Sequence, residues 1–144
     1  MRAALFLFLL AVVATARACV VNQPLPTGDG HAWRCKTSCR CTYTQSHAGG
    51  SKGAAFTIEP GATATLVCAG NGACEAIGFI VAGDGVANVR CLGNGACKGA
   101  GFKGNATVAC SGNDACDYAG CRDGARIASC GGQKACVGQG GCLH

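Results

Sequence analysis

A cysteine spacing that recurs four times constrains this chain more than any other feature of its sequence. In each copy two cysteines stand six positions apart around a glycine-rich turn: Cys68 and Cys74, Cys91 and Cys97, Cys110 and Cys116, Cys130 and Cys136. The first cysteines of successive copies lie 23, 19 and 20 residues apart. Internal repetition with a period of about 20 residues is typical of solenoids, in which each repeat packs only on its neighbours.

Other positions match in register with these cysteines. An apolar residue stands two places before each first cysteine: Leu66, Val89, Val108 and Ala128. A second column of the repeat contains Phe56, Phe79, Phe102 and Cys121. The short alternating segment before each first cysteine predicts a strand, whereas the frequent glycines would cost a helix about 1 kcal/mol each. The sequence therefore predicts an all-β fold, a short parallel β-solenoid (β-helix) of about four coils over residues 54–144.

The chain has few bulky apolar side chains with which to build a core. From Cys19 onward only 19 of 126 residues are Val, Leu, Ile or Phe, whereas this part holds all 14 Cys and all 24 Gly. Scaffolds with thin cores are commonly held together by disulfides. We therefore expect one narrow domain braced by disulfides, and the high cysteine content argues against a cytosolic enzyme.

The even number of cysteines allows every one of them to be paired. A bridge within each copy, such as Cys68 with Cys74, would close a loop of seven residues and contribute about 2.4 kcal/mol in the chain-entropy estimate. The alternative joins adjacent coils within one column, and the sequence leaves it open. Cys121 and Cys142 occupy nearly equivalent places in successive coils and are expected to pair. Four cysteines then remain to brace the N-terminal segment: Cys19, Cys35, Cys39 and Cys41.

Residues 1–18 have the pattern of a secretory signal peptide, with a basic start, an apolar run over residues 3–14 and a small-x-small site at residues 16–18. The run is too short to span a bilayer and no later apolar stretch is longer, so we expect no integral membrane segment. We expect the mature chain to be secreted and monomeric. Without Arg2 and Arg17, ten basic and seven acidic residues remain and no two basic residues are adjacent, which gives nucleic-acid binding no support.

Residues 19–53 lack the cysteine repeat and hold the single tryptophan and several basic residues. One interpretation is an N-terminal cap that covers the open edge of the first coil, as solenoids require. The other is a recognition patch for an acidic or sugar ligand, and both can hold together. The residues of such a patch would be Trp33, Arg34, Lys36, Arg40 and Tyr43. We favour the cap.

The Cys-x5-Cys spacing, with a small residue three places after the second cysteine (Ala100, Ala119), resembles the disulfide-braced β-solenoids of insect antifreeze proteins. The similarity covers about residues 60–142. It implies the solenoid architecture, and in that family each coil is shorter and presents a Thr-x-Thr array to ice. Here the positions flanking the first cysteines contain no threonine column, and residues 42–44 are a single match. The resemblance therefore supports the architecture and argues against ice binding.

Two clusters of residues could carry chemistry. Cys35, Cys39 and Cys41, with His31 and His47, are zinc ligands by type, but oxidised thiols are the better expectation in an exported chain, so we predict no metal site and no cofactor.

Two carboxylates, Asp114 and Asp117, could form an acid–base pair of the kind that glycan-active β-helix enzymes use. Four coils offer little room for a substrate cleft, and aspartates in glycine-rich turns are more often turn formers.

One polar column and one modification motif complete the candidates. The column Asn71, Asn94, Asn113 and Gln133 could bind a polar ligand, but a stacked amide ladder within a turn explains it more simply. Asn105 begins an Asn-Ala-Thr sequon and lies in an expected loop, so it could be glycosylated in a eukaryotic source.

These features predict a secreted, non-enzymatic repeat protein that presents a rigid binding or structural surface. Its partner would be an unknown extracellular ligand, such as a glycan, the matrix or a cell surface. The first alternative is a secreted effector or toxin-like protein, for which bridges give survival outside the cell. Ice binding and a small glycan-active enzyme come after these.

Overall fold

The computed structural model describes residues 19–142 and contains eleven strands and no helix in that range. The expected signal peptide, residues 1–18, lies outside the described residues. Among residues 19–142 no helix is long and apolar enough to cross a membrane. The strands are β1 (Val20–Pro24), β2 (Ala32–Cys35), β3 (Arg40–Gln45), β4 (Ala55–Ile58), β5 (Thr63–Cys68), β6 (Gly78–Val81), β7 (Val86–Cys91), β8 (Gly101–Lys103), β9 (Ala106–Cys110), β10 (Gly120–Arg122) and β11 (Arg126–Cys130).

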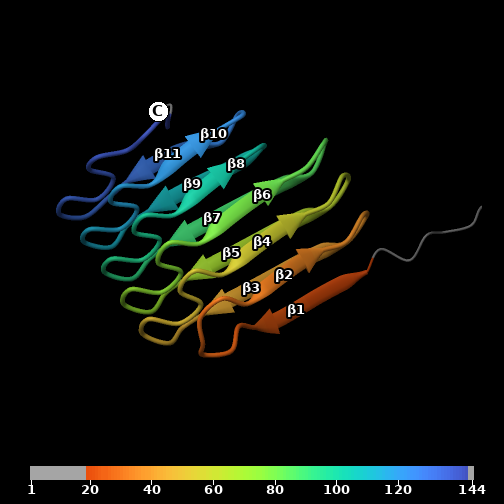
Figure 1. Cartoon of the computed structure of the whole chain (residues 1–144), viewed down its shortest axis with the longest axis horizontal. Coiled ribbons are helices and arrows are strands. Elements are labelled where there is room, and N and C mark those ends of the chain that lie inside the picture. The colour runs from red at the N-terminus through yellow and green to blue at the C-terminus, as the bar shows by residue number, and fades with distance from the viewer. Residues whose placement is uncertain (1–18, 143–144) are drawn as a thin grey trace, which may run out of the picture.

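The strands form two parallel sheets, and the chain alternates between them. One sheet has six strands in the order β1-β3-β5-β7-β9-β11, and the other has five in the order β10-β8-β6-β4-β2. Each coil consists of a strand of the five-stranded sheet, a tight turn, a strand of the six-stranded sheet and a return loop (Figure 1). The expected parallel β-solenoid is therefore confirmed.

The solenoid has about five turns rather than four. Within residues 19–53, β2 and β3 form a complete additional coil, because β2 pairs with β4 and β3 with β5. Only β1 lies beyond that coil, at the end of the six-stranded sheet, where it pairs with β3. The segment expected to be a cap thus contributes strands to both sheets.

The interior is made of residue columns that run along the axis of the solenoid. Burial alternates along the strands, so that every second side chain points inward. Phe56, Phe79 and Phe102 lie in register on β4, β6 and β8, with ring centroids 5.6 and 6.4 Å apart. Tyr43 extends the series at 5.7 Å from Phe56. Aromatic rings that contact one another along the axis therefore supply much of the apolar packing. The rest of the core is built from alanine, half-cystine and aliphatic residues such as Leu66, Val89 and Ile127.

The return loops stack closely because a glycine column lets their backbones approach. A Cβ atom on Gly93 would lie 2.1 Å from the carbonyl oxygen of Gly70, and one on Gly112 would lie 2.1 Å from that of Gly93. Backbone bonds then join successive loops, for example from the amide of Cys97 to the carbonyl of Ala73 at 3.0 Å. The repeated glycines are thus required by coil-to-coil contact.

Candidate binding surfaces

Seven disulfides include all 14 cysteines, and none is free. Four of them close the return loops: Cys68–Cys74, Cys91–Cys97, Cys110–Cys116 and Cys130–Cys136. Cys121 is joined to Cys142. The N-terminal pairs are Cys19–Cys39 and Cys35–Cys41. So many bridges are typical of an oxidising compartment.

Of the two pairings that the sequence left open, the structure has the one within each return loop, although sulfur atoms of adjacent coils are also close. The sulfur atoms of Cys91, Cys110 and Cys116 lie within 4.8 Å of one another. The three cysteines of the alternative zinc site, Cys35, Cys39 and Cys41, are all oxidised in disulfides, as expected for an exported chain.

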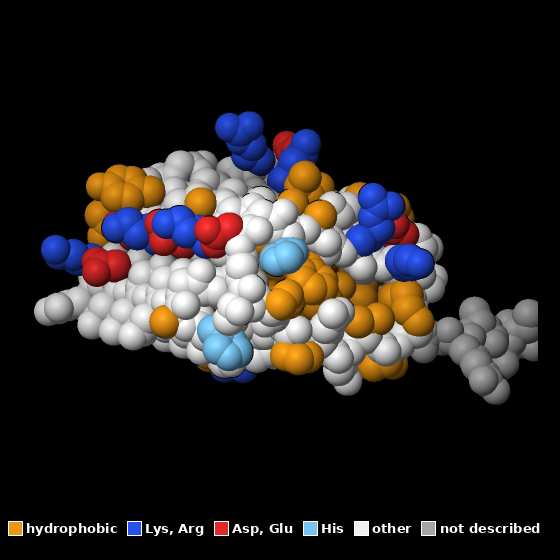
Figure 2. Space-filling view, turned by 60° about the horizontal axis from the view of Figure 1, so that its bottom comes forward, with side chains coloured by type: hydrophobic (Ala, Val, Ile, Leu, Met, Phe, Trp, Pro, Cys, Tyr) orange, Lys and Arg blue, Asp and Glu red, His pale blue; other side chains and the backbone are white. Residues whose placement is uncertain are grey.

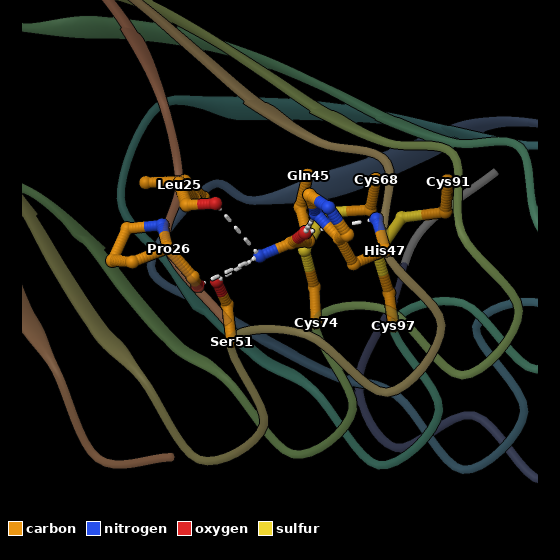
Figure 3. Close-up of a disulfide and its surroundings, with 9 residues drawn as sticks. All are labelled: Leu25, Pro26, Gln45, His47, Ser51, Cys68, Cys74, Cys91 and Cys97. Carbon is orange, nitrogen blue, oxygen red and sulfur yellow. Dashed lines mark hydrogen bonds between the residues drawn. A yellow bond between two sulfur atoms is a disulfide. The ribbon is translucent and has the colours of Figure 1, made fainter. Parts of the chain in front are cut away.

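The first return loop has a hydrogen bond where the other loops have a disulfide. Gln45 is in register with Cys68, and Ser51, like Cys74, has a φ of 58°. The amide nitrogen Nε2 of Gln45 donates to Ser51 Oγ at 2.8 Å and to the carbonyl of Pro26 at 3.1 Å (Figure 3). Both Gln45 and Ser51 are buried. Sequence reasoning missed this coil because it searched for cysteines, although Trp33 precedes Gln45 by the same 12 residues that separate Phe56 from Cys68.

The residues of the alternative N-terminal recognition patch do not form one surface. Tyr43 is only 2% exposed and packs between Trp33 and Phe56, so it is a core residue and is removed from the candidates. Burial also raises the pKa of its phenol. Trp33 is half-buried against the core. Arg34 and Arg40 are exposed but lie on β2 and β3, which belong to different sheets, and Lys36 lies in the turn between them.

Glu59 ties the first turn of the rod to the second. Its Oε2 accepts hydrogen bonds from the amide of Thr37 at 2.9 Å and from its hydroxyl at 3.1 Å, and Arg34 lies 3.4 Å from Oε1. The two Thr37 bonds, followed by the nearby positive charges, hold the pKa of Glu59 below its usual value. This carboxylate is therefore engaged in structure.

The amide column forms a continuous ladder on the return loops. The Oδ1 of Asn71 accepts from the amide of Asn94, Asn94 Oδ1 from Asn113 and Asn113 Oδ1 from Gln133, at 3.3, 3.1 and 2.9 Å. Each side chain thus satisfies a backbone donor of the next coil. This arrangement explains the column without a ligand.

Charged side chains also pair between neighbouring return loops. Lys52 lies 3.1 Å from Glu75, and Lys98 lies 3.3 Å from Asp117. Figure 2 shows positive and negative side chains side by side on the surface of the rod. Asp114 and Asp117, the candidate acid–base pair, line one surface hollow, and Asp117 is only 8% exposed. The pairing of Asp117 with Lys98 gives Asp117 a structural role.

The outer face of the six-stranded sheet, which we call the threonine face, is lined by hydroxyl, amide and guanidinium groups, with Val20, Val67 and Val86 among them. One column of this face runs through strand partners in register: Asn22, Thr42, Thr65, Asn88, Thr107 and Arg126. Threonine occupies three of these six positions, so the column is mixed. The positions that flank the first cysteines contain no threonine column. The mixed column was missed because only the residues adjacent to the cysteines were compared.

The outer face of the five-stranded sheet has a different character. One of its columns consists of small residues: Ala32, Ala55, Gly78, Gly101 and Gly120. A shallow hollow beside this column is lined by Ile80, Lys103, Tyr118 and Arg122, among others. Lys103 is paired with Asp123 at 3.5 Å. Asn105, the sequon residue, is exposed in the turn between β8 and β9.

No family model, curated protein or solved structure matches this chain. The function must therefore be inferred from its own surfaces.

Proposed function

We propose that this chain is a secreted, non-enzymatic protein whose disulfide-braced rod presents a rigid surface to a glycan, the matrix or a cell surface. The observation that carries the proposal is the distribution of the bridges, which include every cysteine and occur in all five coils. A fold held in this way keeps its outer side chains in fixed positions, so that a ligand pays little ordering entropy on the protein side. It also resists unfolding outside the cell.

One member of the candidate acid–base pair, Asp117, and two further carboxylates have structural partners, which supports a binding role. Asp117 is paired with Lys98, Glu59 with Thr37 and Arg34, and Asp123 with Lys103. A general acid or base must instead reach the reacting atom of a substrate. A screen for glycan hydrolysis with the Asp114→Ala and Asp117→Ala variants tests this part of the proposal. The expected result is no activity in any of the proteins, and an activity lost in either variant would contradict it.

The binding role is tested with the oxidised, folded protein on a glycan array and on intact cells. We expect saturable binding to at least one glycan class or to a cell surface. The control is the same chain after reduction and alkylation, which should lose that binding because the outer side chains lose their fixed arrangement. Toxicity to cells without any glycan or surface binding would instead favour the effector alternative.

Ice binding is the alternative raised by the three threonines of the mixed column. Thr42, Thr65 and Thr107 share that column, but Asn88 interrupts it and arginines project from the same face. We therefore expect no thermal hysteresis in freezing-point measurements. A clear hysteresis that Thr65→Val or Thr107→Val removes would establish ice binding.

A further inference from the structure

We infer that the threonine face binds an acidic polysaccharide, one that carries separated carboxylate or sulfate groups along a hydroxylated chain. This inference rests on the proposed function and names its ligand class and its surface. It is carried by the charge and chemistry of the outward-pointing residues on the six-stranded sheet.

The positive charges of the threonine face are not neutralised. Its six strands contain three arginines, Arg40, Arg90 and Arg126, and no Asp or Glu. All three arginines are exposed, and within residues 19–142 none of them forms an ion pair. Unpaired guanidinium groups on a sheet attract anions and can bind a carboxylate or sulfate with two parallel hydrogen bonds.

The four ion pairs of the described residues all lie elsewhere. The five-stranded sheet also carries three exposed cations, Arg34, Lys103 and Arg122, but acidic residues that follow its strands pair with the first two. The other two ion pairs join return loops. Within residues 19–142, three of the six basic residues without an ion pair lie on the threonine face. The other three, Lys36, Arg122 and Lys134, lie in a turn, on the other sheet and in a return loop.

The arginines are regularly spaced along the rod. Arg40, Arg90 and Arg126 lie on β3, β7 and β11, which are every second strand of the six-stranded sheet. Since neighbouring strands are about 4.8 Å apart, successive arginines are separated by about 10 Å along the axis. Across the strands they lie at three different register positions, in the columns that pass through Thr63, Val67 and Thr65. Such spacing suits a long polymer that crosses the face with its acidic groups well separated.

The positions between the arginines offer neutral hydrogen-bonding groups. Thr42, Thr44, Thr63, Thr65, Asn88 and Thr107 all point outward on this sheet, whereas the five-stranded sheet has only Thr57 in an outward position of its strands. Threonine hydroxyls and asparagine amides both donate and accept, as sugar hydroxyls require. The face therefore matches a polymer in which acidic groups alternate with hydroxylated rings.

Membranes and nucleic acids match this face less well. Membrane-surface binding uses Trp, Phe or Leu beside basic residues, and the outward positions of this sheet contain none of these. Nucleic acids carry a phosphate at every nucleotide, and their binding surfaces combine dense basic residues with aromatic stacking. Three separated arginines without aromatic neighbours suit a more sparsely charged polymer.

The test compares two triple variants that change the net charge equally. Arg40→Gln, Arg90→Gln and Arg126→Gln remove the cations of the threonine face, whereas Arg34→Gln, Lys103→Gln and Arg122→Gln remove those of the other sheet. All six side chains are exposed, so both variants should keep the fold, which circular dichroism and non-reducing electrophoresis check. The probe is polygalacturonate, with one carboxylate per sugar, and dextran is the neutral control.

We expect the oxidised protein to bind polygalacturonate and not dextran, and to bind more weakly as salt increases. The threonine-face variant should bind at least about tenfold more weakly, and the matched variant within about threefold of the unmodified protein. Equal losses in both variants would overturn the inference, because binding would then follow net charge alone. Tighter binding to single-stranded DNA or to phosphatidylserine vesicles than to polygalacturonate would also overturn it.

The array and cell measurements separate this inference from the proposed function. If the unmodified protein binds a glycan or a cell surface and the threonine-face variant binds equally well, the face is wrong and the proposed function stands. If the unmodified protein binds no glycan and no cell, both are wrong.

Discussion

At the scale of single residues, the hydrogen bond between Gln45 and Ser51 replaces a covalent bridge. A glutamine is longer than a half-cystine, and the loop provides room at Gly50, where the next coils have alanine at the equivalent positions Ala73 and Ala96. A Cβ atom on Gly50 would lie 2.4 Å from Gln45 Cδ. The three residues thus form one compatible set, and Cys-Ala-Cys forms another.

This compatibility predicts that Gly50→Ala destabilises the unmodified protein but is tolerated when Gln45 and Ser51 are both replaced by cysteine. Gln45 is fully buried and its amide is bonded to Ser51 and Pro26, so moving it aside would break these bonds, and we expect a loss of about 1 to 3 kcal/mol in the free energy of unfolding. With Gln45→Cys and Ser51→Cys as background, an eighth bridge should form and the same alanine should be tolerated. Both backgrounds are compared with and without Gly50→Ala. Denaturant unfolding measures the stability of the four proteins, and mass spectrometry counts their bridges. An equal cost of Gly50→Ala in both backgrounds would contradict this account.

Glu59 makes the stability depend on pH in a defined direction. Because its pKa is lower in the folded chain, its ionised form stabilises the fold at pH values above the usual glutamate pKa, about 4.3, and this contribution is lost as the pH falls through the lowered pKa. Glu59→Gln should therefore be less stable than the unmodified protein at neutral pH, and the difference should shrink in acid.

Denaturant unfolding between pH 3 and pH 7, a range of about four units around that pKa, measures the difference. Thr37→Val, which removes one of the two donors, should show a smaller loss with the same pH dependence. A difference between Glu59→Gln and the unmodified protein that is constant across this range would show that the carboxylate is not bound in the folded state as described.

At the scale of the structural element, the close stacking of successive return loops depends on their glycine column. Gly93→Ala should separate two stacked loops, because the new Cβ atom would overlap the backbone carbonyl of Gly70, which cannot move as a flexible side chain can. We expect a loss of roughly 3 kcal/mol. Gly78→Ala is the matched control, since nothing lies within 4 Å of its Cβ position, and its effect should stay within about 0.5 kcal/mol. Similar costs for the two variants in thermal unfolding would exclude this role of the glycine column.

Strands could be predicted from the sequence only in the coils that contain the repeated cysteine spacing. The strands before Cys68, Cys91 and Cys110 and the parallel stacking followed from the matched columns, and the structure contains them. The first coil was missed because Gln45 and Ser51 keep the geometry of the loop and change its chemistry. The candidate patch was only partly predictable. Alternation along β3 places Tyr43 inside and Arg40 outside, which became clear only once β3 was known to be a strand of the solenoid.

At the scale of the whole molecule, covalent bridges and stacked columns together replace a large apolar core. The aromatic series from Trp33 to Phe102 provides more packing than the low content of bulky residues suggests. The rings share a narrow interior with the column Leu66, Val89 and Val108 from the other sheet. Bridges in every coil lower the conformational entropy of the unfolded chain, and they thereby stabilise a fold whose interior is too narrow for a large apolar core.

The threonine face belongs to this scale too, because no single coil contains it. Its three arginines come from the first, third and fifth coils, and the parallel stacking of the strands places them on one surface. In the sequence they are isolated residues, 50 and 36 positions apart.

The central claim is that the bridges hold the rod together, and unfolding of the oxidised and the reduced, alkylated protein, followed by circular dichroism with thiol titration, tests it most directly. We predict no titratable thiol in the oxidised protein, strand content that persists on heating, and loss of that strand content once the bridges are reduced. A chain that titrates as free thiols and yet keeps its strands and its thermal stability would contradict the account.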